Sequence, residues 1–189
     1  MRLPAKQKKL NTVVMVLQAI KYERGKLQIL DQLRLPHEEV YIDISEPRDA
    51  FKAIKSMQVR GAPAIAIVAA LSLAVHLIDA NIESLTSRDS PAGYIKQQLA
   101  YLVTSRPTAV NLADAARKLT RVVDDAAAQS DASPSIVKEA YIRAAERMLV
   151  DDVRDNEGIG ECGASWIEQE ATKHGSDGKL SVLTHCNTG

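Results

Sequence analysis

The stretch RGAPAIAIVAALSLAVHLI, residues 60–78, decides the fold of this chain. Its body is apolar on almost every side, which is typical of a helix buried in a protein core. Pro63 suits the first turn of such a helix. Ser72 and His76 interrupt the apolar run, which is also shorter than the ~20 residues that a membrane span requires. We therefore expect a buried central helix in a soluble protein.

The residues before this helix predict β structure and one further helix. Residues 17–30 place two β-tolerant stretches around the turn sequence ERGK (23–26), which is typical of a hairpin. EVYIDI, residues 39–44, alternates apolar and polar residues with the period of a half-buried strand. Ser45 is suited to cap a helix that follows it. The apolar stripe of this helix comprises Ala50, Phe51, Ile54 and Met57.

The residues after the central helix predict further helices. Residues 83–93 form a polar loop, apolar residues then recur at helical spacing over 95–103, and a helix restarts after Pro107. Ser133 and Pro134 open a long amphipathic helix. Its inward residues are expected to be Ile136, Val137, Ala140, Tyr141, Ala144, Met148 and Val153.

The end of the sequence predicts a change of domain. A short helix carrying Trp166 and Ile167 is followed by the linker KHGSDGK (173–179) and then by an apolar strand. We expect a basic extension (1–16), an α+β N-terminal domain in which a small β-structured start precedes a helical bundle (17–172), and a linker with the first strand of a further domain (173–189).

Composition excludes several classes of function. The 189 residues carry 24 basic and 24 acidic side chains, so no bulk charge attracts nucleic acid or an anionic membrane. The two cysteines, Cys162 and Cys186, have no CxxC spacing, which argues against a disulfide scaffold or a structural zinc site and suits a reducing compartment. The four histidines show no metal-ligand spacing. We expect no nucleic-acid, membrane or metal partner, and a cytoplasmic location with the nucleus as a second compartment.

GIGECG, residues 158–163, matches the G-x-G-x-x-G pattern of dinucleotide-binding loops. Such a loop needs a hydrophobic strand before it, and a charged helix end stands there instead. We therefore reject a nucleotide site and interpret these glycines as positions of close helix packing.

Arg60 lies directly before Gly61 and Ala62 at the start of the central helix. Free N–H groups, small side chains and a guanidinium could together bind a phosphate-sized anion at this point. An ordinary helix start with a solvent-facing arginine is an equally good interpretation.

Arg106, within SRPTA (105–109), repeats this arrangement before Pro107. The hydroxyl groups of Ser105 and Thr108 are nearby. Alone, the segment is typical of an ordinary helix cap. Two arginines at two helix starts indicate an anion site more strongly than one of them alone.

Cys186 lies at the expected carboxyl end of a strand, where open α/β sheets bind ligands. Backbone N–H groups of residues 187–189 could lower the pKa of its thiol. The spacing alone favours a structural cysteine, the alternative interpretation.

Five blocks of the sequence resemble, in the same order, the family of S-methyl-5-thioribose-1-phosphate isomerases of the methionine salvage pathway. This family also includes the α, β and δ subunits of translation initiation factor 2B. The resemblance extends from about Leu17 to the last residue. The blocks are residues 17–36, 57–75, 105–116, 155–164 and 182–189.

The resemblance implies an aldose–ketose isomerase that converts S-methyl-5-thio-α-D-ribose 1-phosphate to S-methyl-5-thio-D-ribulose 1-phosphate without metal or organic cofactor. By motif, Arg60, Gly61, Ala62 and Arg106 would bind the sugar phosphate, and Cys186 would be the catalytic cysteine that handles the proton at C2. The route, by proton or by hydride transfer, stays open. Two alternatives also stay open, a non-catalytic regulatory subunit resembling initiation factor 2B and a ribose-1,5-bisphosphate isomerase.

The family also carries a catalytic aspartate, a substrate-binding glutamine and an Asn–Lys pair downstream of the HCNTG motif, on a Rossmann-like domain. This chain ends before them. We therefore expect residues 173–189 to hold only the first strand of an incomplete Rossmann-like α/β domain, and the chain by itself to be inactive or nearly so. Family members form homodimers largely through that domain, which leaves dimerisation of this chain open.

Overall fold

A three-stranded antiparallel sheet begins the fold. The computed structural model of the chain describes residues 17–79, 90–173 and 181–183. Its strands are β1 (Ile20–Glu23), β2 (Lys26–Leu30) and β3 (Tyr41–Asp43), in the order β1-β2-β3. Gly25 has φ +88° in the β1–β2 turn, a conformation that glycine adopts without strain. The predicted hairpin and strand are both confirmed.

Helix α1 (Pro47–Lys55) follows the sheet, and Ser45 does not cap it. Proline is favoured at the first helical position, which makes Glu46 the cap residue. The Asp49 carboxylate accepts hydrogen bonds from the backbone N–H groups of Ser45 and Glu46, at 3.2 and 3.3 Å. Met57 does not join the apolar stripe: it lies beyond the helix with φ +62°, and 47% of it is exposed.

Helix α2 (Ala62–Asp79) is the core of the domain, as its sequence predicts. Twelve of its residues are buried, from Ile65 to Leu77, and the polar Ser72 among them donates a hydrogen bond to the Ala69 carbonyl at 2.8 Å. By length and composition it is the one helix of the described residues that could cross a membrane, but 67% of it is buried inside the protein.

Two further helices pack on α2. Helix α4 (Pro91–Val103) begins earlier than expected, because Ser90 caps it by accepting a hydrogen bond from the Gly93 N–H at 3.1 Å. Helix α5 (Val110–Ala127) begins later than expected, and Pro107 does not open it. A turn closed by the Ala109 N–H and the Arg106 carbonyl, 2.9 Å apart, occupies the intervening residues.

The last helix is longer than predicted. Helix α6 (Pro134–Lys173) is continuous and includes Trp166, which we had expected on a separate short helix. No proline stands between Val153 and Trp166 to stop it. Val153 is 50% exposed rather than inward, since the helix leaves the core near this position. The predicted inward residues Val137 and Tyr141 are buried.

The glycines of GIGECG lie inside α6, which confirms that they form no dinucleotide loop. Their expected role in close packing is wrong for the described residues, because a Cβ added at Gly158, Gly160 or Gly163 would meet no atom within 4 Å.

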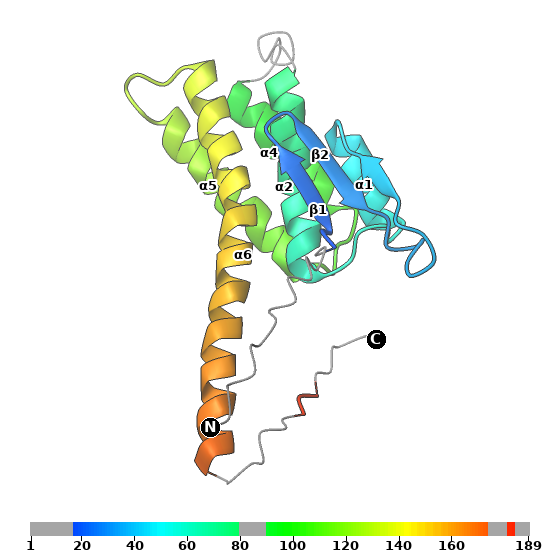
Figure 1. Cartoon of the computed structure of the whole chain (residues 1–189). Helices are drawn as coiled ribbons and strands as arrows, with labels where there is room; N and C mark the ends of the chain where they lie inside the picture. The colour runs from blue at the N-terminus through cyan, green and yellow to red at the C-terminus, as the bar shows by residue number, and fades with distance from the viewer. Residues whose placement is uncertain (1–16, 80–89, 174–180, 184–189) are drawn as a thin grey trace, which may run out of the picture.

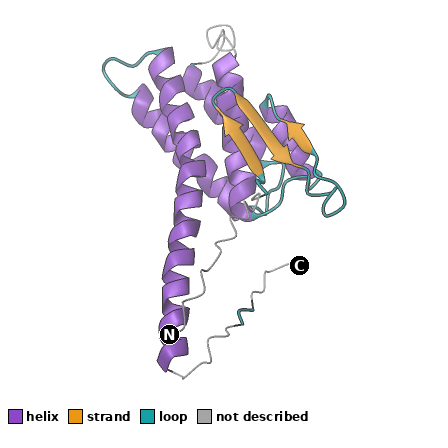
Figure 2. Cartoon of the chain, viewed as in Figure 1, coloured by secondary structure: helices purple, strands orange, loops and turns teal. Residues whose placement is uncertain are grey.

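The four longer helices run alternately up and down, and the sheet and α1 lie together on one side of them (Figures 1 and 2). Contacts of α2 with α1, α4, α5, α6 and β2 place it at the centre. The second half of α6 extends beyond the body of the domain (Figure 1).

The expected first strand of a Rossmann-like domain is not confirmed. Residues 181–183 form no strand, and Val182 and Leu183 are 73% and 94% exposed. The other residues of that segment lie outside the described part of the chain.

Candidate functional site

The start of α2 presents backbone donors to solvent. Gly61 has φ +91° directly before the helix, a left-handed conformation that favours glycine. Its carbonyl accepts the first helical hydrogen bond, from the Ile65 N–H at 3.0 Å. Arg60, Gly61 and Ala62 are all exposed, and the first turn carries no acidic residue. A helix start of this kind favours an anion through its unpaired N–H groups and its dipole.

Arg106 lies half-buried in the turn that connects α4 to α5. The neighbouring Ser105 is buried and its hydroxyl donates to the Leu102 carbonyl at 2.6 Å, so this hydroxyl is already satisfied within the turn. Arg106 therefore remains as the charged group of this helix start, while Ser105 positions the turn.

The fold brings the two helix starts to one end of the bundle. Pro63, in the first turn of α2, and Asn111, in the first turn of α5, line a common hollow of about 450 Å³. Arg60 lies a few positions before Pro63, and Arg106 lies a few positions before Asn111. The two segments that the sequence singles out thus approach the same end of the domain, although neither arginine lines the hollow itself.

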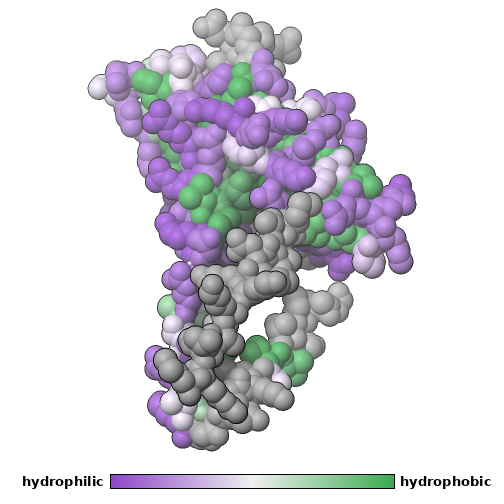
Figure 3. All heavy atoms as spheres, in the orientation of Figure 1, coloured by the Kyte–Doolittle hydropathy of each residue, from purple (hydrophilic) through white to green (hydrophobic). Residues whose placement is uncertain are grey.

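A second hollow, of about 590 Å³, lies between the hairpin and α6. It shares Pro63, Ile67 and Asp152 with the first, so the two flank the initial turns of α2. Ile20, Leu149 and other apolar side chains line it. In the space-filling view, hydrophobic side chains gather where the middle of α6 meets the body of the domain, and hydrophilic ones surround them (Figure 3).

Carboxylates dominate the charge of the first hollow. Its lining includes one lysine, Lys118, and the acidic residues Asp114, Asp151, Asp152 and Asp155. Hydrogen bonds from Lys118 and Arg117 hold the pKa of Asp114 below its ordinary value. This lining therefore disfavours an anionic group inside the first hollow. Sequence reasoning missed these residues because VDDVRD is also typical of a solvated helix surface.

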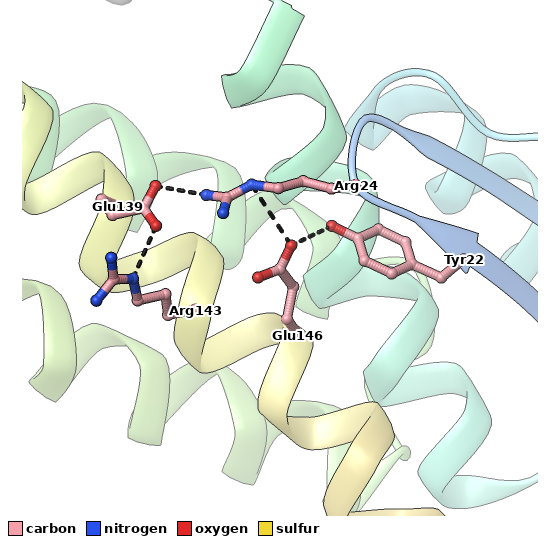
Figure 4. Close-up of polar contacts among 5 residues, drawn as sticks. All are labelled: Tyr22, Arg24, Glu139, Arg143 and Glu146. Carbon is pink, nitrogen blue, oxygen red and sulfur yellow. Dashed lines mark hydrogen bonds and ion pairs between the residues drawn. The ribbon is translucent and has the colours of Figure 1, made fainter.

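A polar network fastens the hairpin to α6 beside the second hollow (Figure 4). Tyr22 donates a hydrogen bond to the Glu146 carboxylate at 2.8 Å. Arg24 pairs with Glu139 at 2.5 Å and lies 3.8 Å from Glu146. Arg143 pairs with Glu139 from one turn along the helix, at 2.8 Å. Since Tyr22 lines the hollow, this network holds one of its walls in place.

The remaining candidate residues are the cysteines and the histidines. Cys186 lies outside the described residues, and Cys162 is an exposed free thiol on α6. His76 shares a hydrogen bond with the Tyr94 hydroxyl at 2.8 Å. Within residues 17–79, 90–173 and 181–183, no group of three or more His, Cys, Asp or Glu side chains could hold a metal ion.

The family model described as the initiation factor 2 subunit family matches residues 58–189. The chain belongs to this family. Within it, a methylthioribose-1-phosphate isomerase of Pyrenophora tritici-repentis is 58% identical over 93% of this chain and 44% of its own length. A methylthioribose-1-phosphate isomerase of Aspergillus clavatus is 51% identical over 93% of this chain and 46% of its own length. The chain thus spans less than half the length of these relatives.

Two solved structures have a similar fold. The crystal structure of 5-methylthioribose 1-phosphate isomerase from Pyrococcus horikoshii matches 80% of this chain and 41% of its own, with a TM-score of 0.68 and 25% identity. Translation initiation factor eIF-2B subunit delta from A. fulgidus matches 72% of this chain and 38% of its own, with a TM-score of 0.59 and 28% identity. The part of this chain that matches the isomerases covers 93% of it and is longer than the segment 58–189. The resemblance to the isomerases therefore extends into the sheet and α1.

Proposed function

We propose that this chain forms the sugar-phosphate-binding part of a methylthioribose-1-phosphate isomerase, an aldose–ketose isomerase of methionine salvage. The observation that carries the proposal is the 58% identity, over 93% of the chain, to a protein of that name. The matched 93% of the chain leaves few residues outside the similarity.

The proposed roles follow from charge and position. Arg60 and Arg106 bind the phosphate, assisted by the small residues Gly61 and Ala62, which allow it to approach the start of α2. The two helix starts at one end of the bundle, each preceded by an arginine, support this assignment. Cys186 handles the proton at C2 of the sugar, by a proton-transfer or a hydride-transfer route, and no metal or organic cofactor takes part.

We propose that the rest of the reaction depends on groups outside the part of the relatives that this chain matches. We propose that the 189-residue chain by itself turns over little or no substrate, because moving a proton between C1 and C2 requires a second acid or base and a dry pocket. We propose a cytoplasmic and nuclear location. Homodimerisation would be a property of the whole protein.

Isothermal titration of the purified chain with ribose 1-phosphate tests the phosphate site. Arg60→Gln and Arg106→Gln should each weaken binding about tenfold or more, because each removes a charge-assisted hydrogen bond. Arg34→Gln is the matched control, since Arg34 is exposed and pairs only locally with Glu38. Unchanged affinity in both site variants would refute the proposed phosphate site.

The proposed inactivity has its own measurement. Purified chain incubated with S-methyl-5-thioribose 1-phosphate should form no ketose above background. Conversion at a rate normal for an isomerase would contradict the inactivity while supporting the enzyme assignment.

A non-catalytic subunit is the second candidate, supported by the structural match to eIF-2B subunit delta. Co-purification of the chain with other initiation-factor subunits, together with no measurable sugar-phosphate binding, would favour it. A ribose-1,5-bisphosphate isomerase is the third candidate, and tighter binding of ribose 1,5-bisphosphate than of the thioribose substrate would favour that alternative.

A further inference from the structure

Asp152 occupies a position that no other charged residue of α6 shares. It lines both hollows that flank the first turns of α2. It is half-buried, whereas Asp155, one turn further along α6, is exposed. Pro63, at the start of α2, lines the same two hollows, so Asp152 faces the region between the helix start and the hairpin.

The other carboxylates of the first hollow already have cationic partners. Asp114 pairs with Lys118 at 2.7 Å and also with Arg117. Asp151 and Asp155 both pair with Arg154, at 2.9 and 3.1 Å.

Asp152 differs from these three carboxylates. Among the residues that the structure describes, no ion pair or hydrogen bond reaches its carboxylate. Its backbone lies within α6, and its backbone carbonyl also accepts a hydrogen bond from the Asn156 side chain at 2.8 Å. Because no buried side-chain oxygen of the described residues lacks a partner, the oxygens of this half-buried carboxylate reach solvent and are available to a bound molecule.

We propose that Asp152 is a substrate-binding residue whose carboxylate accepts hydrogen bonds from the hydroxyl groups of the pentose. This inference rests on the proposed function and deepens it. A sugar phosphate has an anionic end and a neutral, hydroxyl-bearing end. Arg60 and Arg106 attract the first, and the carboxylate of Asp152 repels it but accepts hydrogen bonds from the second.

The positive charges of the arginines and the negative charge of Asp152 therefore orient the bound sugar phosphate. The phosphate remains near the two arginines, and the ring hydroxyls turn toward α6. The network of Tyr22, Arg24 and Glu146 supports this geometry, because it fastens the hairpin to α6 less than two turns before Asp152 and so holds the facing wall of the hollow.

The test compares two probes on the purified chain, inorganic phosphate and ribose 1-phosphate, by isothermal titration at one pH and ionic strength. Asp152→Asn should weaken the binding of ribose 1-phosphate about tenfold. The same variant should bind inorganic phosphate as well as before, or more tightly, because a repelling charge is gone. Asp155→Asn is the matched control and should leave the ratio of the two affinities unchanged.

Each result bears on a separate statement. Arg60→Gln should weaken both probes, which separates the phosphate site from the hydroxyl site. If the unaltered chain binds both probes and Asp152→Asn keeps their affinity ratio, the role of Asp152 is refuted while the phosphate site stands. If the unaltered chain binds neither probe, the proposed function fails and this inference fails with it. Urea unfolding of Asp152→Asn should match the unaltered chain, and a large loss of stability would instead indicate a structural role.

Discussion

The hydroxyl of Tyr22 on β1 donates a hydrogen bond of 2.8 Å to the carboxylate of Glu146 on α6, across 124 residues of sequence. Burial and this hydrogen bond to a carboxylate raise the pKa of Tyr22 well above its ordinary value, so the phenol keeps its proton and remains a donor. The contact closes one side of the hollow beside the start of α2, and it joins the part of the chain before residue 58 to the helix that carries Asp152.

Replacing Tyr22 by phenylalanine should lower the free energy of unfolding by about 1 kcal/mol, because a partly buried carboxylate loses its hydrogen-bond donor. Urea unfolding measures the change. Tyr41→Phe is the control: its hydroxyl donates to the Gln18 carbonyl at an exposed position, and the loss there should be about 0.5 kcal/mol or less. Equal losses of unfolding free energy in the two variants would show that the Tyr22–Glu146 hydrogen bond stabilises the fold no more than an exposed one does.

The ion pair of Glu139 should give the stability a defined acid dependence. Hydrogen bonds from Arg24 and then Arg143 lower the pKa of Glu139 from 4.5 to about 2 in the folded chain. A lowered pKa contributes stability above the unfolded value, and that contribution disappears as the pH falls from 4.5 toward 2. Because the pair is largely exposed, its contribution should be about 1 kcal/mol or less.

Comparison of Glu139→Gln with the unaltered chain isolates this effect. The difference in unfolding free energy should be present at neutral pH and should vanish in acid. Asp125→Asn, at an exposed position of α5, should show no difference at any pH. A Glu139→Gln difference that persists at pH values near 2 would contradict the assignment.

Two glycine substitutions should change stability in opposite directions. Gly61→Ala should destabilise by about 1–2 kcal/mol, because φ +91° is strained for a residue with a Cβ even though the added atom would make only an ordinary contact with Ala64. Gly158→Ala should stabilise by about 0.5–1 kcal/mol, since the site lies inside α6 and has open space around it. Thermal and urea unfolding check both signs, and destabilisation by Gly158→Ala would imply a contact there that the described residues do not make.

Shortening a buried side chain of the core helix α2 should strongly lower the free energy of unfolding. Leu73 is fully buried in α2, and Leu73→Ala should lower the free energy of unfolding by about 2–5 kcal/mol through lost burial and a residual cavity. Val150→Ala, at a position of α6 that is 65% exposed, should change it by about 0.5 kcal/mol or less. A small loss for Leu73→Ala would contradict the central place of α2 in the fold.

Local chemistry made several elements predictable from the sequence. The hairpin around Gly25 and the α6 start at Pro134 follow from turn and cap residues that act over a few positions. Two of the errors, both in helix starts, lie where two local signals competed. Ser45 and Pro107 resemble helix-start signals, and the positions of Pro47 and of the turn ending at Ala109 decided the actual starts.

The candidate site was predictable only in part. Arg60 and Arg106 stand out because each precedes a helix start, but their shared end of the bundle is a consequence of helix direction and packing. The acidic lining gave no sequence signal, because VDDVRD has the same pattern whether it faces solvent or a hollow.

The sequence by itself determined that residues 60–78 form the core, because a helix that is apolar on every side can be stable in water only when other elements cover it. Only the tertiary structure decided which carboxylate of α6 lines both hollows beside the start of α2. The cations that pair with Asp114, Asp151 and Asp155 lie on the same helix as each carboxylate, within four residues of it. Asp151 and Asp152 both line the first hollow, and of the two only Asp152 also lines the second hollow, beside the hairpin. Long-range packing, which no short pattern encodes, sets that difference.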